Sequence, residues 1–273
     1  MKNSSGSFFR DVLWQIAQPG VMVASGISLL VFSLASNYFI YDLVVPNSTL
    51  AFPAGLYDLL LSSSPLGLVL PLVMAVPFTL PWVAWIRNRF ATYARLRIGA
   101  RRMLAASYFG NAIVSFLVFF LIGFIPYFWV AFGDVTYHPE SWHLLTSEDI
   151  KEAEETYSTF SQFSAWGSWG YPLMYSLWLA MNAVLYSAVS LSLVILVRNK
   201  ALAISLPWIS YLIAIYTFAV LWLEAYSPTL VWPFNLTQQP LWHLLVPLTM
   251  MVLIAGTLVT TVLVRAPKLS QLQ

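Results

Sequence analysis

The sequence predicts an all-α integral membrane protein with six transmembrane helices and both termini on the cytoplasmic side. Two observations support this fold class: long uninterrupted apolar runs, and basic residues confined to one side of those runs. Of the 273 residues, 59% are hydrophobic and only 9% are charged, which is more apolar surface than a soluble domain of this size can bury. Continuous runs, rather than short alternating segments, favour helices over a β-barrel.

The apolar runs define six spans in a single transmembrane domain over residues 1–273. A hydrocarbon core about 30 Å thick needs roughly 20 apolar residues per helix, and each run reaches that length. The predicted spans are residues 21–43, 66–86, 103–132, 171–197, 202–223 and 241–264. The fourth and fifth spans are separated by Arg198-Asn199-Lys200 and one further residue, which predicts a tight turn between antiparallel helices.

The charged residues set the orientation of these spans. With six spans, all but one of the 13 Lys and Arg residues fall on one side of the membrane, and Lys151 is the exception. An excess of Lys and Arg in short loops marks the cytoplasmic face, so both termini are predicted to lie inside. All but one of the 11 Asp and Glu residues lie at or beyond the outer boundary, and Asp11 is the exception.

A shorter helix is predicted before the first span, over residues 8–16. Its apolar side chains share one face at helical spacing, as in a helix that lies in the membrane interface. The apolar face comprises Phe8, Phe9, Val12, Leu13 and Ile16, and the polar residues elsewhere are Arg10, Asp11 and Gln15. Pro19-Gly20 then predicts a break in the chain. The other interpretation of this segment is a frayed terminus in contact with lipid.

The longest polar segment is the outer loop 133–170, between the third and fourth spans. Thr146 or Ser147 is a suitable N-cap for a helix in this loop. The apolar residues that then repeat at helical spacing are Ile150, Ala153, Tyr157 and Phe160. We therefore expect an amphipathic helix that lies on the outer face of the membrane.

No motif in the sequence indicates a catalytic or metal-binding site. No ionisable residue lies in the middle of a predicted span, which argues against carriers that bind a coupling ion there. His138, His143 and His243 match no metalloprotease pattern, and there is no cysteine. No glycine-rich loop of the P-loop type precedes a lysine. We expect no enzymatic activity, no cofactor and no metal site in this chain, so any ATP dependence must come from a partner.

Four polar residues within the spans are candidates for a substrate path: Asn37, Asn111, Asn182 and Ser187. Amides and hydroxyls are costly to leave unpaired in lipid, so each of them needs a partner. One interpretation is packing of helices through small residues and interhelical hydrogen bonds. The other is that these side chains line a translocation path.

Six arginines fall in the cytoplasmic basic loop 87–102, which joins the second and third spans. Phe90, Ala94 and Ile98 recur every four residues in this loop, which predicts a short amphipathic helix. The planar guanidinium group suits bidentate pairing with carboxylates or phosphates. Three interpretations stay open: the arginines set the topology, they bind anionic lipid headgroups, or they belong to a coupling helix that docks on a cytoplasmic ATPase.

The order of these features resembles that of the ABC-2 type permeases, the membrane subunits of bacterial ABC exporters. The shared features are the short interfacial helix, six spans with both ends inside, and a basic loop between the second and third spans. The run Arg95-Leu-Arg97-Ile-Gly99-Ala-Arg101-Arg102-Met-Leu is similar to the Arg-Leu, Gly, Ser-Arg pattern that leads into the third span of that family.

The resemblance implies the permease subunit of an ATP-driven exporter in a bacterial cytoplasmic membrane. It implies two kinds of protein partner: cytoplasmic P-loop ATPase subunits, which bind ATP and Mg, and a second six-span permease subunit, identical or not. Nucleic acid is not among the expected partners. Substrate would pass between the paired subunits along the first, second and fifth spans. The implied ATPase-coupling residues are Arg95, Arg97, Arg101, Arg102, Ile98 and Phe90.

Two other functions stay open. The first is a non-transport membrane module, such as an immunity, sensor or scaffold protein, that recognises a cationic ligand through the acidic outer loop 134–155. The second is a secondary transporter, which is disfavoured because the spans carry no charge and we find no internal repeat.

Overall fold

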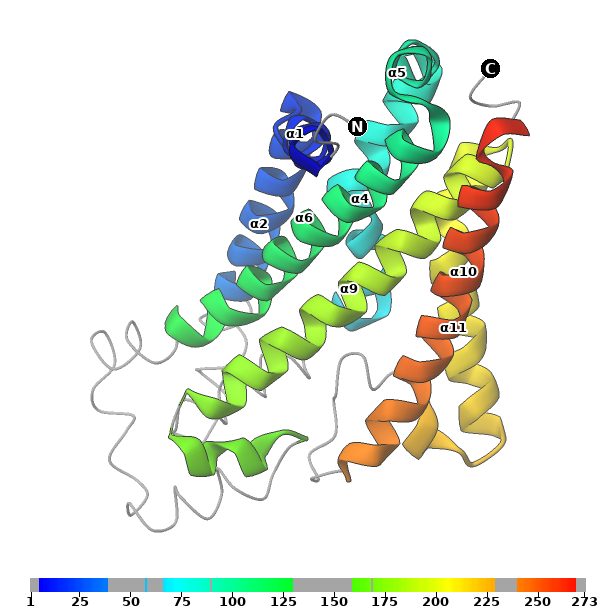
Figure 1. Ribbon diagram of the computed structural model, residues 1–273. Coiled ribbons are helices and arrows are strands. Elements are labelled where there is room, and N and C mark those ends of the chain that lie inside the picture. The colour runs from blue at the N-terminus through cyan, green and yellow to red at the C-terminus, as the bar shows by residue number, and fades with distance from the viewer. Residues whose placement is uncertain are drawn as a thin grey trace, which may run out of the picture.

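The computed structural model describes residues 5–38, 57, 66–88, 90–129, 159–167, 169–228 and 240–268, and the regular elements within them are helices (Figure 1). The α-helices there are α1 (Ser5–Ile16), α2 (Pro19–Tyr38), α4 (Leu66–Arg87), α5 (Phe90–Ile98), α6 (Ala100–Trp129), α9 (Gly170–Leu196), α10 (Lys200–Val220) and α11 (Leu241–Arg265). The 3₁₀ helices are η5 (Ser161–Trp166), η6 (Glu224–Tyr226) and η8 (Ala266–Lys268). The predicted all-helical class is confirmed.

Long apolar helices make this chain a multi-pass, membrane-embedded protein. Over the described residues, α4, α6, α9, α10 and α11 are each long and apolar enough to cross a membrane. The helices α1 and α2 meet this criterion only as a pair, Phe8–Ile16 with Pro19–Ala35, which is bent by 53° at the break between them. Five predicted spans are therefore confirmed individually, and the count reaches six if the bent pair forms one span.

Several helices begin earlier than predicted, among them α6 and α2. The helix α6 begins at Ala100, because its first turn extends into the polar end of the bundle with Arg101 and Arg102. The helix α2 begins at Pro19, so the break lies just before Pro19-Gly20 and not within it. Proline suits the first turn of a helix because it lacks the amide hydrogen that would have no partner there.

The helix α9 lies at the centre of the bundle (Figure 1). It packs against α4, α6, α10 and α11, and 67% of its most apolar segment is buried, against 17% in both α10 and α11. Its contact with α6 is close: a Cβ placed on Gly123 would lie 2.9 Å from Ser176 Oγ and 3.1 Å from Ser176 Cα. Small residues allow such approach, and close packing is a main source of helix association in lipid.

The turn between α9 and α10 is tight, as predicted. Asn199 caps α10 by accepting a hydrogen bond from the amide of Leu202 at 3.2 Å. The Lys200 ammonium donates to the carbonyl oxygens of Val194 at 2.8 Å and Val197 at 3.1 Å, at the end of α9. Both contacts satisfy backbone groups that would otherwise lack partners at helix ends.

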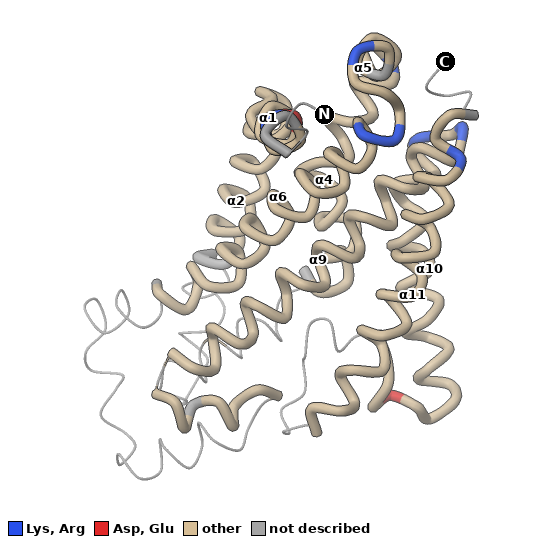
Figure 2. The backbone as a smooth tube through the Cα atoms, viewed as in Figure 1, with Lys and Arg blue, Asp and Glu red and all other residues tan. Residues whose placement is uncertain are grey.

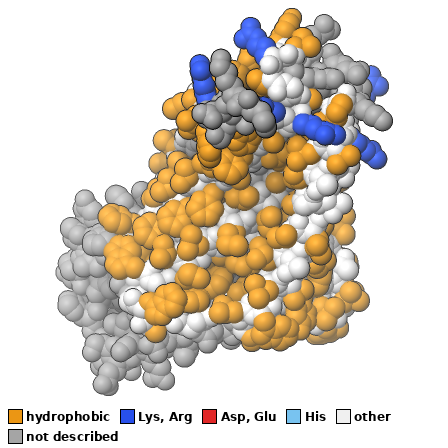
Figure 3. Space-filling model, in the orientation of Figure 1, with side chains coloured by type: hydrophobic (Ala, Val, Ile, Leu, Met, Phe, Trp, Pro, Cys, Tyr) orange, Lys and Arg blue, Asp and Glu red, His pale blue; other side chains and the backbone are white. Residues whose placement is uncertain are grey.

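Charged side chains gather at the ends of the bundle. Figure 2 shows the described Lys and Arg residues at the end formed by α5 and the junction of α9 with α10, whereas η6, which carries Glu224, lies at the opposite end. Figure 3 shows apolar side chains over much of the surface between. A bundle whose middle lies in hydrocarbon is expected to have this pattern, and its basic end is the one predicted to face the cytoplasm.

The helix predicted over residues 8–16 is present as α1, but its faces differ from the prediction. Val12 and Gln15 are buried on the side that packs against α6, whereas Phe9 and Leu13 are exposed. The helical spacing predicts Gln15 away from the apolar face. Its Nε2 donates to the carbonyl oxygen of Met103 at 3.3 Å, so this amide has a protein partner that lipid could not supply.

The amphipathic helix predicted in the outer loop falls largely on residues 130–158, which lie outside the described residues. Phe160, the last residue of the expected repeat, is described. It lies in a turn with φ of 76° and packs against Phe163 and Trp178, with ring centroids 6.3 and 5.8 Å away. The prediction of helix is therefore wrong at Phe160, because a left-handed backbone cannot continue an α-helix.

Gly123→Ala should destabilise the bundle, because the added methyl group would collide with Ser176 and push α6 away from α9. We expect the free energy of unfolding to fall by about 1–3 kcal/mol, the usual cost of overpacking, as measured by denaturant unfolding in mixed micelles. Gly26→Ala on α2 is the control, because a Cβ there meets no described atom within 4 Å. Equal stability of the two variants would contradict the close α6–α9 contact.

Candidate functional site

The candidate coupling element is α5, a short helix that projects at the basic end of the bundle between α4 and α6 (Figure 1). Gly99 separates α5 from α6 with φ of +79°, a left-handed conformation that glycine adopts without strain. One side of α5 packs inward: Ala91 is buried, and Ala94 and Ile98 contact the core. A short helix is therefore present in this loop, as predicted, and Ile98 fixes its end to the bundle.

The outward side of α5 is apolar as well as basic. Tyr93 and Leu96 expose 65% and 78% of their surfaces, and Arg97 is exposed beside them. Arg101 is exposed in the first turn of α6. We call these four residues the α5 face. It contains two of the predicted coupling arginines, while the side chain of Arg95 lies outside the described residues.

An aromatic cluster holds the beginning of α5. Phe90 stacks on Trp14 of α1 with ring centroids 5.6 Å apart and an interplanar angle of 25°, and it lies 5.3 Å from the Trp85 ring of α4. The Trp14 and Trp85 rings are themselves 5.6 Å apart, so the three rings contact one another. Such pairs contribute about 0.5–1.5 kcal/mol each beyond their burial. Phe90, a predicted coupling residue, thus fastens α5 to α1 and α4.

Arg102, another predicted coupling residue, is used within the chain. Its Nε and Nη2 both lie 2.8 Å from Oδ2 of Asp11, which joins α6 to α1. The two side chains are 34% and 20% exposed, so solvent screens the pair and its stabilising effect is modest. Among the described residues, Asp11 is the acid at the basic end of the bundle. Its carboxylate neutralises the charge of Arg102.

Two of the predicted path residues, Asn111 and Ser187, meet at the contact between α6 and α9. Asn111 Nδ2 donates to Ser187 Oγ at 3.0 Å, and Ser115 Oγ donates to Asn111 Oδ1 at 3.4 Å. All three side chains are completely buried. In this structure they therefore form interhelical and intrahelical hydrogen bonds, which matches the packing interpretation of these positions.

The other polar residues in the spans differ in their pairing: the hydroxyls of Ser25, Thr79 and Ser190 are buried without a hydrogen-bond partner among the described residues, whereas two further residues are paired. The Tyr108 hydroxyl lies 2.8 Å from Ser192 Oγ across the same α6–α9 contact. Asn182 is buried, and its Nδ2 donates to the carbonyl oxygen of Trp178 within α9 at 2.9 Å. The side chain of Asn37, near the end of α2, lies outside the described residues. A role of these residues in a substrate path stays a prediction.

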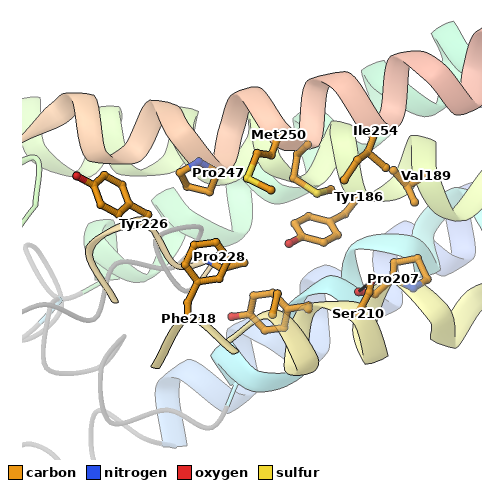
Figure 4. A pocket seen from close by; sticks show the side chains of 13 residues that line it. Tyr186, Val189, Pro207, Ser210, Phe218, Tyr226, Pro228, Pro247, Met250 and Ile254 are labelled. Atoms are coloured by element: carbon orange, nitrogen blue, oxygen red, sulfur yellow. Dashed lines mark hydrogen bonds between the residues drawn. The ribbon is translucent and has the colours of Figure 1, made fainter. Parts of the chain in front are cut away.

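A cavity of about 260 Å³ lies between α9, α10 and α11 (Figure 4). It exists because α10 and α11 both pack against α9 and make few contacts with each other. Its lining is largely apolar, and the residues with a hydroxyl group that line it include Tyr186, Tyr211 and Ser210. Sequence reasoning missed this cavity because three separate helices form it. Pro207 and Pro247, which line it from α10 and α11, were the available signal.

No cluster of three or more metal-ligating side chains occurs among the described residues. His243 packs against the rings of Trp242 and Tyr226, with centroids 4.0 and 5.1 Å away. His138 and His143 lie outside the described residues. The expected absence of a metal site stays a prediction.

Comparisons with protein-family models, curated proteins and solved structures give no match for this chain. The fold itself defines the class: a multi-pass, all-helical membrane protein. The resemblance to the ABC-2 type permeases therefore depends on the order of the helices and on the basic segment that forms α5 and the first turn of α6.

The hydrogen bond between Asn111 and Ser187 should appear as a coupling energy in a double-mutant cycle. For Asn111→Ala and Ser187→Ala we expect a coupling of about 0.6 kcal/mol, the average for such bonds in membrane proteins, measured by unfolding in mixed micelles. The control cycle pairs Asn111→Ala with Ser192→Ala, because Ser192 contacts Tyr108 instead. A coupling near zero in the first cycle would contradict the packing role.

Single-cysteine labelling should place the two ends of the bundle on opposite sides of the membrane. The chain has no cysteine, so Leu96→Cys and Trp222→Cys each introduce a unique thiol at an exposed site. A membrane-impermeant maleimide should label Leu96→Cys only in inside-out vesicles and Trp222→Cys only in intact cells. Labelling of Leu96→Cys from outside would reverse the predicted orientation.

Proposed function

We propose that this chain is the permease subunit of an ATP-driven ABC transporter, an exporter in a bacterial cytoplasmic membrane, energised by separate ATPase subunits. The observation that carries the proposal is α5, which is fixed to the bundle on one side and exposes the α5 face on the other. The α5 face exposes a leucine and a tyrosine beside two arginines. This composition favours a surface that binds a protein over one that contacts only solvent, since aromatic residues and arginine are enriched in protein interfaces.

The contacts beneath α5 support a coupling role. Its inner side packs on α4 and α6, and the Phe90 ring stacks on Trp14 of α1. The helices α4 and α6 in turn pack on the central α9. A displacement of α5 would therefore be passed to the middle of the bundle through packed side chains, which are a physical route for coupling between distant sites.

The chemistry of the α5 face indicates what a partner must offer. Arg97 and Arg101 suit carboxylates, because the guanidinium group pairs with them in bidentate geometry. Leu96 suits an apolar depression that removes its side chain from water. In this proposal ATP and Mg belong to the P-loop ATPase, whose surface would carry acidic residues around an apolar recess.

A second permease subunit is part of the proposal. The helices α2 and α10 both pack on α4, and both carry exposed apolar side chains, such as Ile27 and Leu30 on α2 and Ile213 and Tyr216 on α10. These helices correspond to the first and fifth predicted spans. They thus offer apolar surface where the family resemblance implies that paired subunits enclose the substrate.

The proposal is tested by co-purification of the full chain from its native membranes. We expect a P-loop ATPase in the purified fraction, identified by mass spectrometry. The double variant Arg97→Glu/Arg101→Glu should retain less than about a tenth of it while staying in the membrane, since two favourable charge pairs become repulsive. Arg102 is left unchanged because its reversal would disturb the ion pair with Asp11.

Arg265→Glu is the matched control, because it reverses an exposed arginine at the same end of the bundle but outside the α5 face. Release of the ATPase by this control, or its retention by the double variant, would contradict docking at α5. Absence of any P-loop ATPase from the wild-type fraction would contradict the permease assignment and favour a non-transport module acting through the outer loop 134–155.

A further inference from the structure

We propose that the cavity between α9, α10 and α11 binds an uncharged, lipid-soluble molecule that carries a carbonyl or hydroxyl oxygen. This binding site lies apart from α5 and does not depend on the permease assignment. A cavity of about 260 Å³ is larger than the roughly 150 Å³ apolar cavity that takes up benzene in a soluble protein. It is therefore large enough to hold a small ligand.

The lining of the cavity restricts the ligand to an uncharged molecule. The described residues that line it are apolar or carry only hydroxyl groups, and no Asp, Glu, Lys, Arg or His is among these described residues. A charged group in this environment would lose its hydration without gaining an opposite charge, which is costly. Aliphatic side chains such as Val189 and Ile254, with Met250, provide contact for a hydrocarbon body.

Tyr186 supplies the polar contact that determines the ligand's chemistry. Its side chain is 3% exposed, and Figure 4 shows its ring projecting between α10 and α11. The neighbouring hydroxyls already donate: Tyr211 to the Gly67 carbonyl oxygen at 3.2 Å, and Ser210 to that of Pro207 at 2.9 Å. Within the described part of the chain, the Tyr186 hydroxyl makes no hydrogen bond. A buried tyrosine hydroxyl normally has a partner, and an acceptor oxygen on the ligand would provide it.

The cavity is accessible from the hydrocarbon of the membrane. Met250 and Ile254 of α11 line it and are also exposed, and so is Ser210 of α10. The opening therefore lies between two membrane-spanning helices and faces the lipid. A ligand that partitions into the bilayer can reach Tyr186 laterally, without passing through water. A hydrocarbon without oxygen would fit the same space but leave the hydroxyl unpaired.

Photolabelling of the purified full chain in lipid nanodiscs tests this site. The probes are a fatty acid methyl ester that carries a diazirine and the matched diazirine alkane, which has no oxygen. We expect the ester to label residues that line the cavity. Tyr186→Phe should lower labelling by the ester about fivefold, the effect of losing one hydrogen bond, and should leave labelling by the alkane unchanged. An equal effect on both probes, or no effect on either, would overturn the assignment.

Filling the cavity provides an independent second measurement. Ala214→Trp and Ser210→Trp place a large ring at two different points of the lining, and each should lower labelling by both probes at least fivefold. Ala219→Trp is the control, because this exposed alanine lies on the same helix outside the cavity. Labelling that the cavity variants leave unchanged, spread evenly over the exposed faces of α2 and α11, would show surface lipid contact only and overturn the proposal. Neither outcome affects the ATPase experiment.

Discussion

The close contact between α6 and α9 determines how the other helices are arranged. In a membrane, separating two helices exposes them to lipid as apolar as themselves, so association must come from close packing and hydrogen bonds. Gly123 allows the backbone of α6 to approach Ser176, and Asn111 donates to Ser187 farther along the same interface. The remaining sides of α9 are then occupied by α4, α10 and α11. Their positions follow from a helix that is itself fixed by small and polar residues.

The bundle has two parts with different packing. The helices α1, α2, α4 and α9 each pack against α6, and α5 is joined to this part by aromatic rings and core residues. On the other side, α10 and α11 bury little of their surface and touch α9 more than each other. The compact part contains the contacts of α5 with α1, α4 and α6, through which a displacement of α5 would reach the bundle. The open part includes the cavity, because helices that diverge from a common neighbour leave space that side chains do not fill.

The sequence predicts the helices and the ends of the bundle well, because length, apolarity and charge are properties of single segments. It predicts less well which side of each helix packs against protein and which side is exposed. Gln15 and Leu13 exchange their expected environments, since apolarity alone does not tell whether the neighbour of a helix is lipid or protein. The ion pair of Asp11 with Arg102 joins residues 91 positions apart, beyond the reach of any local pattern. The cavity needs three helices in known positions, so it could be found only from the fold.

The position of α1 has a consequence for how the protein is synthesised. Among the described residues, its contacts outside α2 include later parts of the chain, such as Trp85, Phe90, Arg102 and Met103. A chain that emerges from the ribosome in order cannot form these contacts until the beginning of α6 has been made. The 53° angle between α1 and α2 is therefore fixed late, after α4 is available for insertion. The N-terminal segment is therefore the first part of the basic end to be synthesised, but it can reach its final position only after the beginning of α6 has been made.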